Sequence, residues 1–171
     1  PGLLGTDKVL IGRDARLSSP EIREYLIAGI TDAGADVTDI GLATTPMVYY
    51  ATASYGFKAS VQITASHNTK EYNGMKVSAA NALPVGKENG LALIEQWINE
   101  GKECQKSEKK GKVMFMDIKD EYIAFQMKYK GDYSALKIGI DLSNGMSALV
   151  IKDILKEKCG ETFYICDTVD G

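Results

Sequence analysis

A short polar stretch at residues 64–76 holds the side chains of this sequence that are best suited to phosphoryl chemistry. It contains Ser66, which is directly followed by His67, the only histidine among the 171 residues. The amide of Asn68 comes next, and Lys76 ends the stretch. A hydroxyl beside an imidazole, with an amide and a cation nearby, could hold or transfer a phosphate. This stretch is therefore the first candidate for a functional site.

The stretch follows residues 59–63, Ala-Ser-Val-Gln-Ile, whose alternating pattern predicts a buried β-strand. Ser, Thr and Asn side chains bond to nearby backbone groups, so the residues after this strand are typical of a tight loop. In an open α/β sheet, ligands bind in the crevice where loops leave the carboxyl ends of strands. The same composition is also typical of a turn without function, and both interpretations stay open on the pattern alone.

Composition and charge are those of an ordinary soluble globular protein. Hydrophobic residues make up 44% of the chain and the net charge is −3, so nothing indicates nucleic acid or an anionic membrane as a partner. No apolar run is long enough to span a membrane. Cys104, Cys159 and Cys166 are widely spaced and odd in number, which argues for reduced thiols and against a disulfide framework or a metal site. These features favour the cytoplasm, and the oligomeric state stays unknown.

Strand and helix patterns alternate along the first 131 residues. In order they are a strand at 8–12, a helix ending at 34, a strand at 37–41, a helix at 46–56, a strand at 59–63, a returning segment at 76–78, and helices at 88–100 and 117–129. The first helix has two possible starts. Ser19 can cap it with Pro20 at the first helical position, or Ser18 and Glu21 can form a capping box. The alternation predicts an α/β fold with a mixed, mostly parallel sheet and helices on both faces.

The pattern restarts after a linker at residues 131–134. A strand at 136–141, a helix at 148–158 and a strand at 162–166 follow in turn. A unit that ends on its second strand lacks the neighbours that would bury its outer faces. We therefore expect one domain at residues 1–131, which carries the Ser66 loop, and the truncated beginning of a second, similar α/β domain at residues 135–171.

Several groups of residues resemble landmarks of the α-D-phosphohexomutase family, which includes bacterial-type phosphomannomutase and phosphoglucomutase. Residues 64–68, Thr-Ala-Ser-His-Asn, together with residues 71–76, Glu-Tyr-Asn-Gly-Met-Lys, are similar to the family's phosphoserine loop. Residues 12–18, the pair at 45–46 and the turn at 141–145 also match family landmarks, in the family's order. The resemblance implies that residues 1–131 are the family's domain I.

The chain also departs from the family pattern. The family usually has proline where this chain has Thr69, a change that loosens the loop backbone and removes no reacting atom. Members have four domains, and neither an N-terminal Tyr-Asp-x-Arg-Gly segment nor an Asp-Gly-Asp-Gly-Asp-Arg metal loop occurs in these residues. We therefore expect an N-terminal fragment that is inactive by itself.

The resemblance implies an isomerase of the phosphotransferase type. Such an enzyme interconverts hexose 1-phosphate and hexose 6-phosphate, of mannose or glucose, through a phosphoserine and a bisphosphate intermediate. Ser66 matches the phosphoserine, His67 and Lys76 match its catalytic neighbours, and Thr64 and Asn68 belong to the phosphate loop. The implied cofactor is Mg²⁺, bound in this chain only by a phosphate oxygen on Ser66, with glucose 1,6-bisphosphate or an equivalent as activator.

Two alternatives stay open. One is a non-catalytic α/β module that binds phosphosugars, and the other is a phosphoglucosamine mutase, whose loop usually begins Ser-Ala-Ser.

Other polar candidates have structural explanations. Arg13, Asp14 and Arg16 are expected to brace the turn after the first strand through an internal ion pair. Asp141 and Asn144 are expected to form a helix-capping turn. The lysine-rich segment at 102–112 is expected to be a solvated loop, because lysine is rarely buried.

Overall fold

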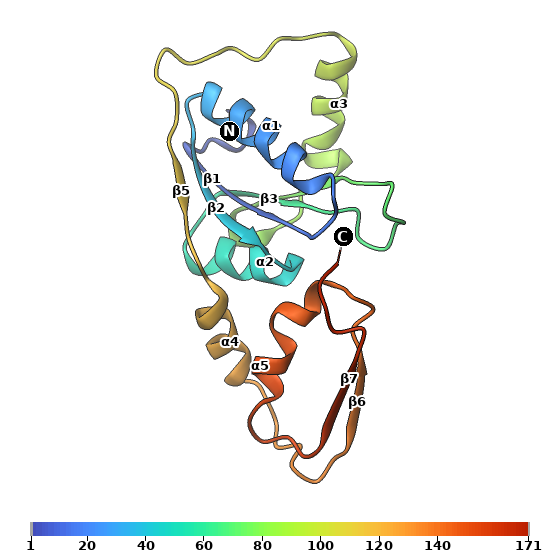
Figure 1. Cartoon of the computed structure of the whole chain (residues 1–171). Helices are drawn as coiled ribbons and strands as arrows, with labels where there is room; N and C mark the ends of the chain where they lie inside the picture. The colour runs from blue at the N-terminus through green and yellow to red at the C-terminus, as the bar shows by residue number, and fades with distance from the viewer. Residues whose placement is uncertain (1, 171) are drawn as a thin grey trace.

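The computed structural model of the chain describes residues 2–170, and its strands form two separate sheets (Figure 1). The strands are β1 (Lys8–Arg13), β2 (Asp36–Leu42), β3 (Ala59–Ile63), β4 (Met75–Ala79), β5 (Val113–Phe115), β6 (Ile138–Asp141) and β7 (Thr162–Ile165). The larger sheet has the order β4-β3-β1-β2-β5, and the smaller one pairs β6 with β7. Neighbouring strands run parallel except for β3 and β4, which are antiparallel. The predicted mixed, mostly parallel sheet is confirmed.

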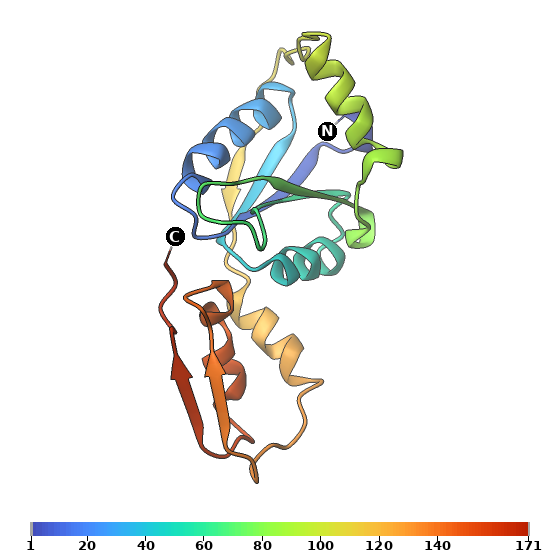
Figure 2. The same ribbon diagram turned by 90° about the vertical axis from the view of Figure 1, so that its right-hand side faces the viewer.

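Helices cover both faces of the larger sheet (Figure 2). The α-helices of residues 2–170 are α1 (Ser19–Asp32), α2 (Thr45–Ser54), α3 (Leu91–Asn99), α4 (Lys119–Met127) and α5 (Ile151–Leu155). Successive side chains of β1 point to opposite faces of the sheet. Leu10 packs with residues of α2 and α4, whereas Val9 and Ile11 pack with residues of α1. Two hydrophobic cores thus hold the sheet between its helix layers.

Strand β3 has the predicted bounds, and all five of its residues are buried. Its two polar residues, Ser60 and Gln62, face α2 and its amino-terminal loop. The hydroxyl of Thr52 on α2 donates to Ser60 Oγ at 2.7 Å. The side-chain amide of Gln62 donates to the carbonyl of Ala43 at 3.0 Å. The strand is therefore covered on both faces, and its polar positions hold neighbouring elements instead of meeting solvent.

The predicted side-chain caps of the first helix are wrong. Ser18 occupies the N-cap position of α1, with Pro20 in the first turn, but no serine side chain bonds to a helix N–H. The hydroxyl of Ser19 instead donates to Asp14 at 2.6 Å, and Ser18 accepts a hydrogen bond from Asn73 at 3.0 Å. Both hydroxyls are engaged by neighbouring loops, so neither the Ser19 cap nor the capping box with Glu21 forms.

Other boundaries also differ from the prediction. The short edge strand β5, Val113–Phe115, is not predicted from the sequence, because three exposed residues are too few to show a hydrophobic periodicity. The helix expected at 148–158 is divided into a 3-10 turn, Met146–Leu149, and the five-residue helix α5. Segment 102–112 is largely exposed, as expected.

The part of the chain that carries the smaller sheet packs against the helices of the larger sheet through α4 and α5. Val150, next to α5, is buried in the same core as Ile118 and Tyr122 of the α4 region. Phe163 and Ile165 of β7 lie on the other side of the small sheet and are exposed. The division into domains at residues 1–131 and 135–171 remains a prediction.

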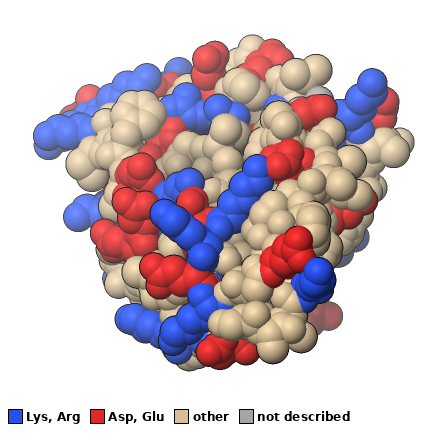
Figure 3. All heavy atoms as spheres, turned by 60° about the horizontal axis from the view of Figure 1, so that its bottom comes forward, with Lys and Arg blue, Asp and Glu red and all other residues tan. Residues whose placement is uncertain are grey.

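Charges are mixed on the face of the molecule that Figure 3 shows. In Figure 3, which brings the lower end of Figure 1 forward, acidic and basic side chains are interspersed. In residues 2–170 no helix has both the length and the apolar character needed to cross a membrane. Cys104, Cys159 and Cys166 are free thiols.

Candidate functional site

A cleft of about 480 Å³ lies at the carboxyl ends of β1, β2 and β3. These strands are adjacent and parallel, so the loops that follow them meet at one edge of the sheet. The loops contribute residues 14–16, 43–45 and part of 64–70, and the turn at 143–146 and Asp170 add to the lining. The sequence predicts a site at this edge of the sheet, and Ser66, His67, Thr64 and Asn68 all line the cleft.

Ser66 occupies a corner of its loop and is exposed. Its φ of 57° lies in the left-handed region, which a residue with a side chain rarely adopts. The Ser66 N–H donates to Thr64 Oγ1 at 3.0 Å. The backbone and side-chain N–H groups of Asn68 donate to the Ala65 carbonyl at 3.1 and 3.0 Å. Thr64 and Asn68 therefore shape the backbone that presents the Ser66 hydroxyl.

Arg16 holds this loop from the loop that follows β1. Its Nη1 donates to the carbonyls of Thr69 at 2.7 Å and Tyr72 at 3.1 Å. Its Nη2 donates to the carbonyls of Ser66 at 3.1 Å and Asn68 at 2.8 Å. A planar guanidinium with five donors is suited to such a set of acceptors. One side chain thus satisfies four carbonyls around the turn that carries Ser66.

The position of Arg16 is in turn set by Asp14. The expected ion pair between them is present, with Arg16 Nε 3.1 Å from Asp14 Oδ2, and both side chains are largely buried. Asp14 also accepts the Ser19 hydroxyl at 2.6 Å. Asn73, at the far end of the Ser66 loop, donates to the hydroxyls of Ser18 and Ser19 at 3.0 and 2.9 Å. This network ties both ends of the loop to the start of α1.

The basic side chains of residues 64–76 lie in two places. His67 and Lys70 line the cleft, whereas Lys76 is not among its lining residues in the part of the chain from 2 to 170. Lys76 lies on β4, directly opposite Gln62 of β3, and is exposed. Lys70 is not among the predicted site residues, although it lies in the same polar stretch. The proximity of Lys76 to a phosphate on Ser66 remains a prediction.

Gln62 is not among the predicted site residues either, because its sequence pattern indicates only a strand. It lines the cleft and is 1% exposed. Its Oε1 is the buried side-chain polar atom without a hydrogen-bond partner in the described residues 2–170. A Cβ on Gly12 of β1 would lie 2.8 Å from Oε1 and 2.7 Å from Val48 Cγ2. Glycine at position 12 is therefore what makes room for the Gln62 carboxamide.

The turn at residues 143–146 brings the smaller sheet to the cleft. Ser143 and Asn144 both have left-handed φ, of 46° and 52°. Asp141 accepts the Ser143 N–H at 2.9 Å, and no side chain caps the 3-10 turn that starts at Met146. The expected helix-capping role of this turn is therefore wrong, because its carboxylate bonds within the turn. The Asp170 N–H donates to the Asn144 carbonyl at 3.1 Å.

One carboxylate of the loop has a shifted pKa. The pKa of Glu71 lies below its ordinary value, mainly because its carboxylate accepts a side-chain hydrogen bond from Thr69. A hydrogen bond from its own backbone and the charge of Arg16 act in the same direction.

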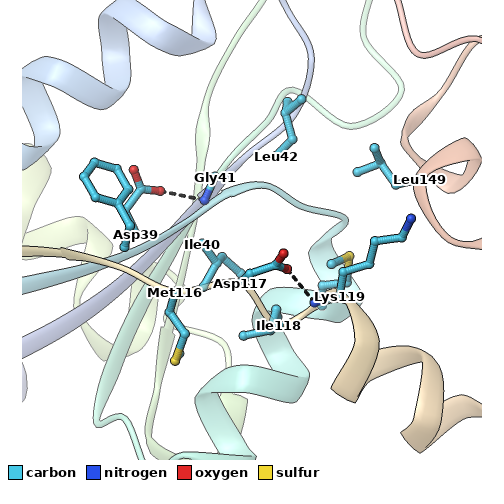
Figure 4. Close-up of a pocket in the computed structure, with 11 residues that line it drawn as sticks. Asp39, Ile40, Gly41, Leu42, Met116, Asp117, Ile118, Lys119 and Leu149 are labelled. Carbon is cyan, nitrogen blue, oxygen red and sulfur yellow. Dashed lines mark hydrogen bonds between the residues drawn. The ribbon is translucent and has the colours of Figure 1, made fainter.

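A second hollow, of about 410 Å³, lies between β2 and the segment that leads into α4 (Figure 4). Its carboxylates are already engaged by the chain. Asp39 accepts the Gly41 N–H at 2.8 Å, and Asp117 accepts the Lys119 N–H at 2.9 Å. Arg23 Nε also donates to Asp39, at 2.6 Å. With its polar groups paired, this hollow is a weaker candidate than the Ser66 cleft.

The sequence of this chain is similar to those of known proteins. The family model "Phosphoglucomutase/phosphomannomutase, alpha/beta/alpha domain I" matches residues 3–105. A phosphomannomutase from Escherichia coli is 33% identical over 153 residues, which are 87% of this chain and 34% of that protein. A probable phosphoglucosamine mutase from Thermococcus kodakarensis is 37% identical over 156 residues, which are 90% of this chain and 34% of that protein.

The fold of this chain is also similar to a solved structure from the same family. The crystal structure of a phosphoglucomutase/phosphomannomutase family protein from Burkholderia thailandensis superposes with a TM-score of 0.79 and 27% identity, over 97% of this chain and 37% of that one. The chain spans about a third of the length of the curated relatives it matches. The chain belongs to the phosphoglucomutase/phosphomannomutase family, also called the α-D-phosphohexomutases.

Proposed function

We propose that the chain is the amino-terminal part of a phosphohexomutase, which interconverts the 1-phosphate and 6-phosphate of mannose or glucose through a phosphorylated Ser66. The observation that carries the proposal is the loop around Ser66. Its hydroxyl is exposed at a left-handed corner, and Arg16 holds four carbonyls of that loop. A backbone conformation that costs energy is retained at sites where a side chain must be presented.

In the proposed reaction, a phosphoryl group on Ser66 Oγ passes to the free hydroxyl of a hexose monophosphate. The P–O bond to the sugar forms as the P–Oγ bond breaks, and the sugar hydroxyl gives up its proton. The resulting bisphosphate returns its other phosphoryl group to Ser66. His67, the neighbour of Ser66 in the cleft, is the group suited to hold a proton or position the phosphate.

Fixed cations are needed because the transferring group is highly charged. A phosphoserine carries about −1.5 to −2 charges at neutral pH. Lys70 lines the cleft, and Lys76 lies on the neighbouring strand opposite Gln62. Arg16 is already occupied by loop carbonyls and by Asp14, so we assign it to positioning the loop.

Mg²⁺ is the proposed cofactor, because an oxygen-rich phosphoserine suits a hard divalent cation. In residues 2–170 no group of three or more His, Cys, Asp or Glu side chains could hold a metal ion. The residues described here therefore fit the ion only through a phosphate oxygen on Ser66. When bound, the ion neutralises charge on the phosphoryl oxygens.

The remaining assignments rest on the same proposal. Residues 1–131 form the domain that carries the phosphoserine, and residues 135–171 begin a second one. Hexose phosphates are the substrates, and glucose 1,6-bisphosphate or an equivalent is the activator. The three free thiols support the cytoplasm as the compartment. A phosphoglucosamine mutase is the second candidate, because the Thermococcus protein that is 37% identical carries that name.

A coupled assay on the full-length protein tests this proposal. With Mg²⁺ and glucose 1,6-bisphosphate, we expect turnover of mannose 1-phosphate or glucose 1-phosphate, and loss of turnover in Ser66→Ala. Ser54→Ala, at the end of α2, is the matched control and should keep full activity. Glucosamine 1-phosphate as the only substrate would select the second candidate. No turnover of any of the three sugars, with phosphosugar binding retained, would indicate a binding module. The chain of residues 1–171 alone is expected to show only background.

A further inference from the structure

The amino end of α2 opens into the Ser66 cleft. Thr44 and Thr45 line the cleft and are half-buried. Thr44 caps the ten-residue helix, because its Oγ1 accepts the Met47 N–H at 3.3 Å. The first N–H groups of a helix have no partner inside it, and Pro46 carries none. The Thr45 N–H and the two threonine hydroxyls are therefore the donors that this helix end can offer to a ligand.

A helix amino terminus attracts anions, but every helix has one. The independent observation here is Gln62, which lines the same cleft and is 1% exposed. Its Nε2 donates to the carbonyl of Ala43, the residue before the Thr44 cap, and its Oε1 has no partner among residues 2–170. Buried polar atoms almost always have a partner, so an unpaired acceptor on a cleft wall points to a ligand.

The carboxamide is also maintained at a structural cost. A methionine at position 62 would have nearly the same shape and no unpaired acceptor. Gly12 must lack a side chain to leave room for Oε1. The chain therefore keeps a buried amide that packing alone does not require, and uses it to hold the backbone just before α2.

We propose that Thr44, Thr45 and Gln62 form an oxyanion subsite for the phosphoryl group that is exchanged at Ser66. The subsite rests on the proposed function and adds residues to it. The threonine hydroxyls and the Thr45 N–H donate to phosphoryl oxygens, and the helix dipole favours their charge. Gln62 positions the helix start through its hydrogen bond to the Ala43 carbonyl, and its free acceptor suits a sugar hydroxyl.

The location of the subsite follows from the sheet order. β1 lies between β2 and β3, so the loop with Thr44 and the loop with Ser66 flank the same central loop. The other ionisable residues on the cleft are the paired Asp14 and Arg16, together with His67, Lys70 and Asp170. His67 and Lys70 also act on a phosphate at Ser66, so the subsite must be tested by differences between variants.

The test uses the full-length protein with phosphoserine inserted at position 66 during translation. The second ionisation of the phosphate is followed by ³¹P NMR against pH, and free phosphoserine titrates at about pH 6. Donors at the helix end stabilise the dianion, so Thr45→Val should raise the midpoint by about half a pH unit. Thr6→Val, at the opposite end of β1, is the control and should leave the midpoint unchanged.

Gln62→Met separates positioning from simple structural support. We expect the midpoint to rise, because the Ala43 carbonyl loses the donor that positions the helix start. The melting temperature should change little, because the same substitution removes an unpaired buried acceptor. Gln96→Met, on the exposed face of α3, is the matched control and should change neither quantity. A lower melting temperature with an unchanged midpoint would give Gln62 a structural role only and would overturn its place in the subsite.

The outcome is independent of phosphotransfer, because translation installs the phosphate. A raised midpoint in Thr45→Val supports the subsite even if a bisphosphate fails to label Ser66. Unchanged midpoints in both Thr45→Val and Gln62→Met overturn the subsite even if Ser66 is labelled. Failure of the subsite and failure of the mutase proposal are thus distinguishable.

Discussion

The guanidinium of Arg16 donates to the carbonyl of Thr69 at 2.7 Å, joining two loops that are 53 residues apart in the sequence. Arg16 makes the equivalent bond to three further carbonyls of the same turn. The loop after β3 is therefore not held by its own residues alone. It is fixed by a cation from the loop after β1, which in turn is paired with a buried carboxylate.

Replacing Arg16 with Met should destabilise the protein strongly. The change leaves the Asp14 carboxylate, which is 7% exposed, without its cation. Removing one partner of a buried pair typically costs about 3–5 kcal/mol of unfolding free energy. Urea unfolding monitored by circular dichroism measures this loss. Lys137→Met, which breaks the exposed pair with Glu161, is the control and should cost less than about 1 kcal/mol. A similar small loss in both variants would refute the role given to Arg16.

Adding a methyl group at Gly12 should disturb the floor of the cleft. The new Cβ would lie 2.7 Å from Val48 Cγ2 and 2.8 Å from Gln62 Oε1. Overpacking of this kind costs about 1–3 kcal/mol of unfolding free energy. Gly29→Ala in α1 has open space around it and should instead stabilise the protein by about 0.5–1 kcal/mol. Equal effects of the two alanines in a denaturant melt would contradict the close packing at Gly12.

The acid sensitivity of the loop can be tested through Glu71. Its folded-state pKa is below the ordinary value, mainly because of the Thr69 hydrogen bond, so it contributes stability above its unfolded pKa. This contribution is lost as the pH falls through the folded pKa. Thr69→Val removes the main cause, and the Glu71 pKa measured by NMR should rise toward the ordinary value. A pKa that stays equally low in the variant would mean that Arg16 or the backbone is the dominant cause.

Replacing Lys76 and replacing Lys70 test which lysine neutralises the phosphate during catalysis. If Lys76 neutralises the phosphate on Ser66, Lys76→Met in the full-length enzyme should reduce kcat by about 10²–10³. Its exposed position predicts a stability change below about 0.5 kcal/mol. Lys70→Met is the companion variant, because Lys70 lines the cleft. A near-native kcat in Lys76→Met with a large loss in Lys70→Met would transfer the assigned role to Lys70.

Much of this arrangement could be predicted from the sequence. The strand at residues 59–63 and the loop after it follow from apolar residues that change abruptly to Ser, Thr and Asn. The motif also predicts Ser66 as the phosphoserine without any knowledge of its surroundings. The structure adds the left-handed φ of Ser66 and the open cleft in front of it.

Contacts between distant loops could not be predicted. The sequence shows the Arg16 side chain and the Ser66 loop, but not that four carbonyls of the loop turn toward the guanidinium. The caps of α1 were predicted wrongly for a similar reason, because Asp14 and Asn73 engage Ser18 and Ser19 from other loops. Gln62 reads as an ordinary strand residue until its burial and its neighbours are known.

The most direct test of the account is the site of covalent phosphate. The full-length protein is incubated with glucose 1,6-bisphosphate and Mg²⁺, and intact-mass analysis and peptide mapping then locate the label. The account predicts one phosphoryl group on Ser66, which disappears when a hexose monophosphate is added and is absent in Ser66→Ala. A phosphoryl group on Ser18 or Ser60, or turnover without any phosphate on Ser66, would contradict it.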